Sequence, residues 1–147
     1  MSTLLDTNVL SELLRSAPEA VVLAWFSQQP AESLFVSAVT QAEMMLGARL
    51  LPAGKRRNAL QHNIAAMFDE DFSGRILPFD SAAVADYVDI TSARRTAGRT
   101  ISQFDAQIAA IALRHKLKFA TRNIRDFDNC GLTLVNPWLQ IAARRPR

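Results

Sequence analysis

The chain has 147 residues, of which 49 % are hydrophobic and 21 % are charged. This length and composition fit one globular domain over 1–147, and five glycines are too few for a disordered or glycine-rich repeat protein. No apolar run approaches the roughly 20 residues of a membrane-spanning helix, and no leader-like segment opens the chain, so we expect a cytoplasmic protein without a membrane partner. Cys130 is the only cysteine, which excludes an internal disulfide and a four-cysteine zinc site.

The formal net charge is only +3, but the cations are clustered. The clusters are Lys55 to Arg57, Arg94 and Arg95 with Arg99, the 114–125 region, and 144–147. Two or three clusters on one face would form a positive surface suited to a phosphate backbone, and scattered solvated charge is the alternative. The chain has no glycine-rich phosphate loop, which argues against an NTPase or a dehydrogenase.

The first predicted strand ends in a polar triplet. Leu4 and Leu5 read as the end of a buried strand, and apolar residues at helical spacing follow from Val9, so Asp6 falls at the strand-to-helix junction. Ligands of open α/β sheets gather outside the carboxyl ends of the strands. The alternative is that Asp6 or Thr7 only caps the following helix.

A second helix is predicted around Trp25, a second buried strand over 34–36, and a third helix from about 38 to 50. In the third helix one apolar stripe is predicted, formed by Val39, Ala42, Leu46 and Leu50. Glu43 lies within about 40° of the centre of this stripe, which directs its carboxylate inward. Such a position favours a paired or metal-bound group, and the alternative is that Glu43 lies at the edge and reaches solvent.

A fourth helix is predicted over 55–68, with three cations in its first turn. Because cations there oppose the helix dipole, Arg56 and Arg57 are candidates for nucleic-acid binding, together with Arg122 further along the chain. A short strand and turn follow at 75–80, and then a helix from Ser81 to about Thr96.

The last predicted helix covers 101–113, with Ser102 as its cap and Asp105 in its first turn. An acid there is also a common dipole partner, which is the alternative for Asp105. A strand over 118–121 ends before Asn123 and Asp126, and a final strand covers 132–135.

Short apolar strands thus alternate with helices, which predicts an α/β fold whose mostly parallel central sheet is covered on both faces. If Asp6, Glu43 and Asp105 converge, each like-charge pair at about 5 Å repels by about 3 kcal/mol at an effective dielectric of 20, so the cluster must bind a proton or a cation. Carboxylate oxygens suit Mg²⁺ or Mn²⁺, and His62 and His115 stand alone. A metal ion held by carboxylates next to basic side chains is an arrangement that can hydrolyse a phosphodiester bond.

Four segments, in order and at this spacing, resemble PIN-domain proteins, in particular the VapC toxins of their FitB-like branch. They are the stretch from Leu4 to Glu12, the stretch from Ser37 through Glu43 to Gly47, the stretch from Asp105 to Ala110, and Thr121 to Asn123 with Asp126 and Phe127. The resemblance runs from about Leu4 to Trp138. It also includes segments like Gly74 to Asp80 and Asn136 to Trp138.

This resemblance implies a three-layer α/β/α fold and a Mg²⁺- or Mn²⁺-dependent endoribonuclease toxin. It also implies a homodimer, inhibited by a small VapB-like antitoxin in a higher assembly. The family's main acidic positions fall on Asp6, Glu43 and Asp105. Asn8 matches the polar residue that supports the first aspartate, and Thr121 matches the hydroxyl near the site.

The fourth acidic position departs from the family pattern. Many relatives have an aspartate where this chain has Asn123, which contributes an amide oxygen but no charge, so we expect weaker binding of any second ion. Asp126 is the candidate to compensate. One alternative function is a catalytically weak RNA-binding or protein-interaction module; another is an aspartyl phosphohydrolase, although that class needs a second aspartate where Asn8 stands.

Overall fold

Residues 1–139 are described by the computed structural model, and their short apolar stretches form one parallel sheet. Its strands are β1 (Thr3–Leu5), β2 (Leu34–Ser37), β3 (Ile76–Leu77), β4 (Lys118–Ala120) and β5 (Leu134–Val135). They lie in the order β3-β2-β1-β4-β5, and each neighbouring pair is parallel. Strands β2 and β3 extend the sheet on one side of β1, and β4 and β5 extend it on the other, so the strand order reverses between β1 and β4. Ligands of open α/β sheets bind at such a reversal.

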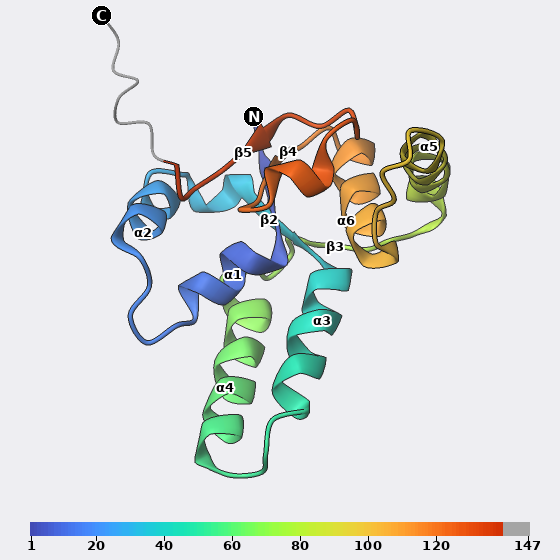
Figure 1. Ribbon diagram of the computed structural model, residues 1–147. Coiled ribbons are helices and arrows are strands. Elements are labelled where there is room, and N and C mark those ends of the chain that lie inside the picture. The colour runs from blue at the N-terminus through green and yellow to red at the C-terminus, as the bar shows by residue number, and fades with distance from the viewer. Residues whose placement is uncertain (140–147) are drawn as a thin grey trace, which may run out of the picture.

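Six α-helices alternate with these strands in the described part of the chain (Figure 1). They are α1 (Thr7–Leu13), α2 (Ala20–Ser27), α3 (Ala38–Arg49), α4 (Lys55–Ala66), α5 (Val84–Thr96) and α6 (Gln103–Arg114). Single helical turns cover Ala31–Ser33, Met67–Asp71, Ser81–Ala83 and Ile124–Phe127. Helices α3 and α4 form a hairpin that extends away from the sheet, while α5 and α6 lie side by side at the right of the view.

Alternate strand residues build two cores, one on each face of the sheet. Leu4 and Phe119 pack into a cluster dominated by α6, and the Phe119 ring meets that of Phe127 edge to face at 4.7 Å. Leu5 and Ala120, the next residue of each strand, pack into a second cluster with side chains of α1, α3 and α4. The three-layer α/β/α architecture expected from the sequence is therefore confirmed.

The predicted buried stripe of α3 is wrong. The buried residues of this helix are Thr40, Met44 and Ala48, whereas Ala42, Leu46 and Leu50 are exposed. The buried face is thus a row spaced by four residues, in which Met44 and Ala48 pack into the second core cluster. Its first member is polar: the Thr40 hydroxyl is 2.9 Å from the hydroxyl of Thr7 in α1, a contact that hydrophobic periodicity alone does not predict.

The basic cluster at 144–147 lies outside the described residues. Within the described residues, no helix is long and apolar enough to span a bilayer.

Candidate functional site

Two paired strands bring the first two site residues together. Asp6 follows β1 and Thr121 follows β4, and the Asp6 N–H donates to the Ala120 carbonyl at 2.9 Å. The Thr121 hydroxyl then donates to Asp6 Oδ2 at 2.7 Å, and the Thr7 N–H donates to Asp6 Oδ1 at 2.8 Å. Asp6 is thus the N-cap of α1 and a residue of the candidate site at once, so the capping alternative does not compete with a functional role.

Asp6 is only 5 % exposed. Burial raises its pKa from 3.8 to about 6; the bonds from Thr121 and Thr7 oppose this rise, and the carboxylates of Asp105 and Glu43 add to it. A carboxylate that is desolvated and repelled by like charges is stabilised when it binds a cation or a proton. This is the electrostatic signature of a functional carboxylate.

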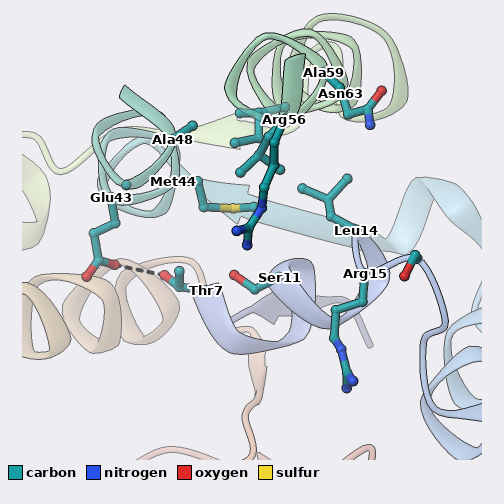
Figure 2. Close-up of a pocket in the computed structure, with 14 residues that line it drawn as sticks. Thr7, Ser11, Leu14, Arg15, Glu43, Met44, Ala48, Arg56, Ala59 and Asn63 are labelled. Atoms are coloured by element: carbon teal, nitrogen blue, oxygen red, sulfur yellow. Dashed lines mark hydrogen bonds between the residues drawn. The ribbon is translucent and has the colours of Figure 1, made fainter. Parts of the chain in front are cut away.

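Glu43 reaches the site from α3. Its Oε1 accepts a hydrogen bond of 2.8 Å from the Thr7 hydroxyl, as the dashed line in Figure 2 shows. The side chain is half-buried. Glu43 is therefore directed to the site as expected, but a threonine of α1 holds it and not the predicted apolar stripe.

Asp105 lies in the first turn of α6, where the Ser102 hydroxyl accepts its N–H at 3.1 Å. The predicted serine cap is confirmed. Burial raises the pKa of Asp105, the Ser102 side chain opposes the rise, and the nearby charge of Asp126 adds to it. The helix dipole alone would lower this pKa, so burial and like charge dominate here.

The polar residues after β4 have different roles. Thr121 Oγ1 accepts the Asn123 N–H at 3.0 Å and the Asn8 side-chain N–H at 3.4 Å, while Asn8 Oδ1 accepts the Arg122 N–H at 3.4 Å. Asn123 lines the same pocket as the three main carboxylates, whereas the exposed Asp126 does not. Of the two candidates for the fourth position, Asn123 therefore lies at the site and Asp126 beside Asp105.

These side chains surround one open pocket of about 460 Å³. It is lined by Asp6, Thr7, Asn8, Ser11, Glu12, Arg15, Glu43, Asp105, Arg122, Asn123 and Trp138. Three carboxylates from β1, α3 and α6, far apart in the sequence, thus share one cavity. Of the predicted nucleic-acid binders, Arg122 lines this pocket, Arg56 lines its neighbour, and Arg57 lines neither.

Sequence reasoning predicted Arg122 at the site but missed its neighbours in the pocket wall, Trp138 and Glu12. The Arg122 guanidinium lies 5.0 Å from the centre of the Trp138 ring, and Asn136 links to both residues through its side chain. Glu12 is buried and accepts bonds from the Glu19 N–H and the Arg15 guanidinium, which lower its pKa in that order of importance. Glu12 thus fixes the turn after α1, and no sequence pattern places these residues beside Asp6.

Arg94 was grouped with the surface cations, and that grouping is wrong. Its side chain is 4 % exposed, on α5. It donates to four carbonyls: Arg99 at 2.6 Å, Asp126 at 2.9 Å, Asp128 at 2.7 Å and Thr100 at 3.5 Å. Arg94 therefore ties the loop before Asp105 to the loop after Asn123. Ile90, one helical turn earlier and also buried, was the available signal, because residues four apart share a helix face.

The donor set at the pocket fits a hard divalent cation, since every side chain in question offers oxygen. Within residues 1–139, however, no three His, Cys, Asp or Glu side chains are already arranged to hold a metal ion. The pocket is open and Asp105 is only half-buried, so rotation of the Asp105 side chain is the movement that would bring its oxygens toward those of Asp6 and Glu43.

The raised pKa of Asp6 gives a pH-dependent stability in chelator. The folded state binds the Asp6 proton more tightly than the unfolded chain does. Protonation of Asp6 therefore stabilises the fold fully below about pH 4, and this stabilisation is lost as pH rises through about 6. We expect the Asp6 share of the free energy of unfolding to fall by about 3 kcal/mol across that range. Urea unfolding from pH 4 to pH 8 measures it, and Asp6→Asn must lack this share. Equal pH slopes for the two proteins would refute the burial argument.

Comparison with known proteins gives consistent matches over most of the chain. Residues 3–131 match the PIN domain. The chain is 42 % identical over 134 residues to VapC ribonuclease Y4jK of Sinorhizobium fredii, covering 91 % of this chain and 96 % of that protein. It is 42 % identical over 135 residues to toxin FitB of Neisseria gonorrhoeae, covering 92 % and 97 %. The solved structure of FitAB bound to an IR36 DNA fragment matches with a TM-score of 0.88 and 41 % identity, covering 94 % of this chain and 96 % of that one.

Proposed function

The chain belongs to the PIN-domain family, and from that premise we propose that it is a metal-dependent endoribonuclease, the toxin of a toxin–antitoxin pair. The observation that supports this most strongly is the pocket in which Asp6, Glu43 and Asp105 converge from three elements. Relatives at 42 % identity are named as a ribonuclease and as a toxin. The substrate class is RNA and the reaction is hydrolysis of a phosphodiester bond.

Asp6, Glu43 and Asp105 would hold the ion, Mg²⁺ or Mn²⁺. When bound, such an ion activates water and neutralises charge on the phosphate under attack. Asp6 is fixed for this role by Thr121 and Thr7, and Glu43 is fixed by Thr7, so each of the two carboxylates presents an oxygen in a set direction. Preorganisation of this kind is what lets charged groups stabilise a transition state.

Asn123 and Thr121 complete the polar wall. Asn123 offers an amide oxygen that can orient water, and the Thr121 hydroxyl keeps Asp6 in place. Since Asn123 carries no charge, we propose that the pocket holds one ion more tightly than a second. Asp126 acts on the site only through its charge near Asp105.

The partner of the proposed toxin is a small antitoxin. The solved FitAB structure pairs its FitB-like chain with a partner on DNA, and we propose a comparable arrangement here: a VapB-like antitoxin that blocks the acidic pocket of a cytoplasmic homodimer. A cationic side chain of the antitoxin would satisfy the same three carboxylates that otherwise attract a metal ion.

One observation favours a second candidate function. Asn123 removes a charge from the pocket, and within residues 1–139 no three acidic side chains are already arranged for a metal. This would suit a catalytically weak module that binds RNA or protein. Against it stands the buried Asp6, whose raised pKa is a cost that a binding module has no reason to retain.

Cleavage of a mixed RNA by the partner-free protein separates the two candidates. The nuclease is expected to cut with Mg²⁺ or Mn²⁺ and to stop in chelator. RNA that is bound but uncut with either ion would favour the binding module.

A further inference from the structure

A second and larger pocket, of about 730 Å³, lies beside the acidic one (Figure 2). It lies between α1, α3 and α4. Four residues line both pockets: Thr7, Ser11, Arg15 and Glu43. The two pockets therefore adjoin along these residues, and a chain bound across the acidic pocket would reach the second one directly.

The second pocket combines an apolar floor with one free cation. Met44, Ala48, Leu60 and Ile64 form the floor. Figure 2 shows the Arg56 side chain extending from α4 into the space between Met44 and Ser11. Within residues 1–139 Arg56 has no hydrogen bond or ion pair, whereas the other cation of the pocket, Arg15, is paired with Glu12 at 3.0 Å. The guanidinium of Arg56 is thus available to an anion.

A glycine on α3 keeps the pocket open. Gly47 lines it from the middle of the helix, where glycine costs about 1 kcal/mol relative to alanine. A Cβ at this position would meet no atom within 4 Å, so no packing contact within the described residues requires glycine here. The pocket beside Gly47 is therefore open space that a larger side chain at this position would fill.

We propose that this pocket is a nucleotide subsite, which holds the ribonucleotide next to the cleaved phosphodiester. Its base and sugar lie on the apolar floor, and its phosphate is bound by Arg56. The proposal rests on the ribonuclease function, and it selects RNA over a protein segment for two reasons. The pocket continues the place where RNA would be cut, and its one unpaired charge complements a phosphate.

The first test is RNA affinity in chelator, where nothing is cut. A fluorescent single-stranded 12-nucleotide RNA of mixed sequence is titrated with the wild type, Arg56→Gln and Lys55→Gln. Lys55 is the matched control, because it is the exposed neighbour on α4 and does not line the pocket. We expect Arg56→Gln to weaken binding roughly fivefold and to reduce the salt slope by about one, with less than about a twofold effect of Lys55→Gln.

The second test fills the pocket without touching its charge. Gly47→Leu adds bulk where there is open space, and Ala42→Leu adds bulk on the exposed face of the same helix as control. We expect weaker RNA binding by Gly47→Leu alone, with melting curves showing that both variants are folded. Equal affinities within either matched pair would overturn the subsite, and a partner segment would then be the occupant to test.

Results that test the subsite can be told apart from results that test the nuclease function. A wild type that binds RNA through Arg56 in chelator but never cuts it with metal would refute the nuclease and keep the subsite. A wild type that cuts RNA, with variants that bind as it does, would refute the subsite alone. Absence of RNA binding by the wild type in chelator, together with no cutting in Mg²⁺ or Mn²⁺, would refute both.

Discussion

Replacing Asp6 with asparagine is expected to lower RNA cleavage by about a thousandfold and, at the same time, to stabilise the protein at pH 7. The loss of activity follows from removing a preorganised charge at the reacting centre. The gain in stability follows from burial: ionised Asp6 is desolvated beside two other carboxylates, and its pKa is raised to about 6. We expect a net increase of about 1–2 kcal/mol in the free energy of unfolding, because mismatched hydrogen bonds offset part of the relief.

The hydrogen-bond mismatch that offsets part of the stability gain in Asp6→Asn arises at Thr121. Thr121 Oγ1 already accepts two N–H groups and donates its proton to Asp6 Oδ2. An asparagine that turns its NH₂ toward Thr121 faces an oxygen with no free acceptor position. Denaturant unfolding at pH 7 in chelator, together with a cleavage assay, measures both effects. An active variant would remove Asp6 from the site, and a variant less stable than the wild type would contradict the electrostatic argument.

Replacing Arg94 with methionine is expected to lower the free energy of unfolding by about 3–4 kcal/mol, the cost of losing several charge-assisted hydrogen bonds from a buried guanidinium. Methionine keeps much of the volume, so the loss reports on the hydrogen bonds to Arg99, Asp126 and Asp128 and not on a cavity. Cleavage should also fall at temperatures where the variant is still folded, because these bonds join the loop before Asp105 to the loop after Asn123.

The matched control for this change is Arg95→Met. Arg95 is the next residue of α5 but is exposed, so its replacement should change stability by less than about 0.5 kcal/mol. Denaturant unfolding of both variants gives the comparison. Equal stabilities for the two variants would mean that Arg94 does not hold the loops together.

The strand ends were predictable from sequence because an apolar run that stops at a polar triplet marks the edge of a parallel sheet. This placed Asp6 correctly. Thr121 was expected inside its strand, which ends one residue earlier at Ala120, and its place at the site followed from the family resemblance. Asp105 was predictable as a first-turn residue, but that sequence signal alone does not separate a dipole partner from a site residue. Asp6, Thr121 and Asp105 come together only through the topology, which pairs β1 with β4 and sets α6 beside them.

Side-chain orientation was the harder part. Glu43 reaches the site through its bond to Thr7, on a helix whose buried face contains the polar Thr40 and not the predicted apolar stripe. Arg94 and Arg95 are adjacent cations, but Arg94 is buried and Arg95 is exposed, a difference that composition cannot predict. Trp138 follows the last strand and reaches the pocket only because β5 pairs with β4.

The central claim is that the three pocket carboxylates together support metal-dependent RNA cleavage. The most direct measurement is cleavage of a mixed RNA in Mn²⁺ by the wild type, Asp105→Asn and Asp126→Asn, each also in chelator. These aspartates lie near each other, but only Asp105 lines the pocket. The expected result is cutting by the wild type and Asp126→Asn that stops in chelator, and none by Asp105→Asn. Cutting that persists in chelator, or in Asp105→Asn, would contradict the claim.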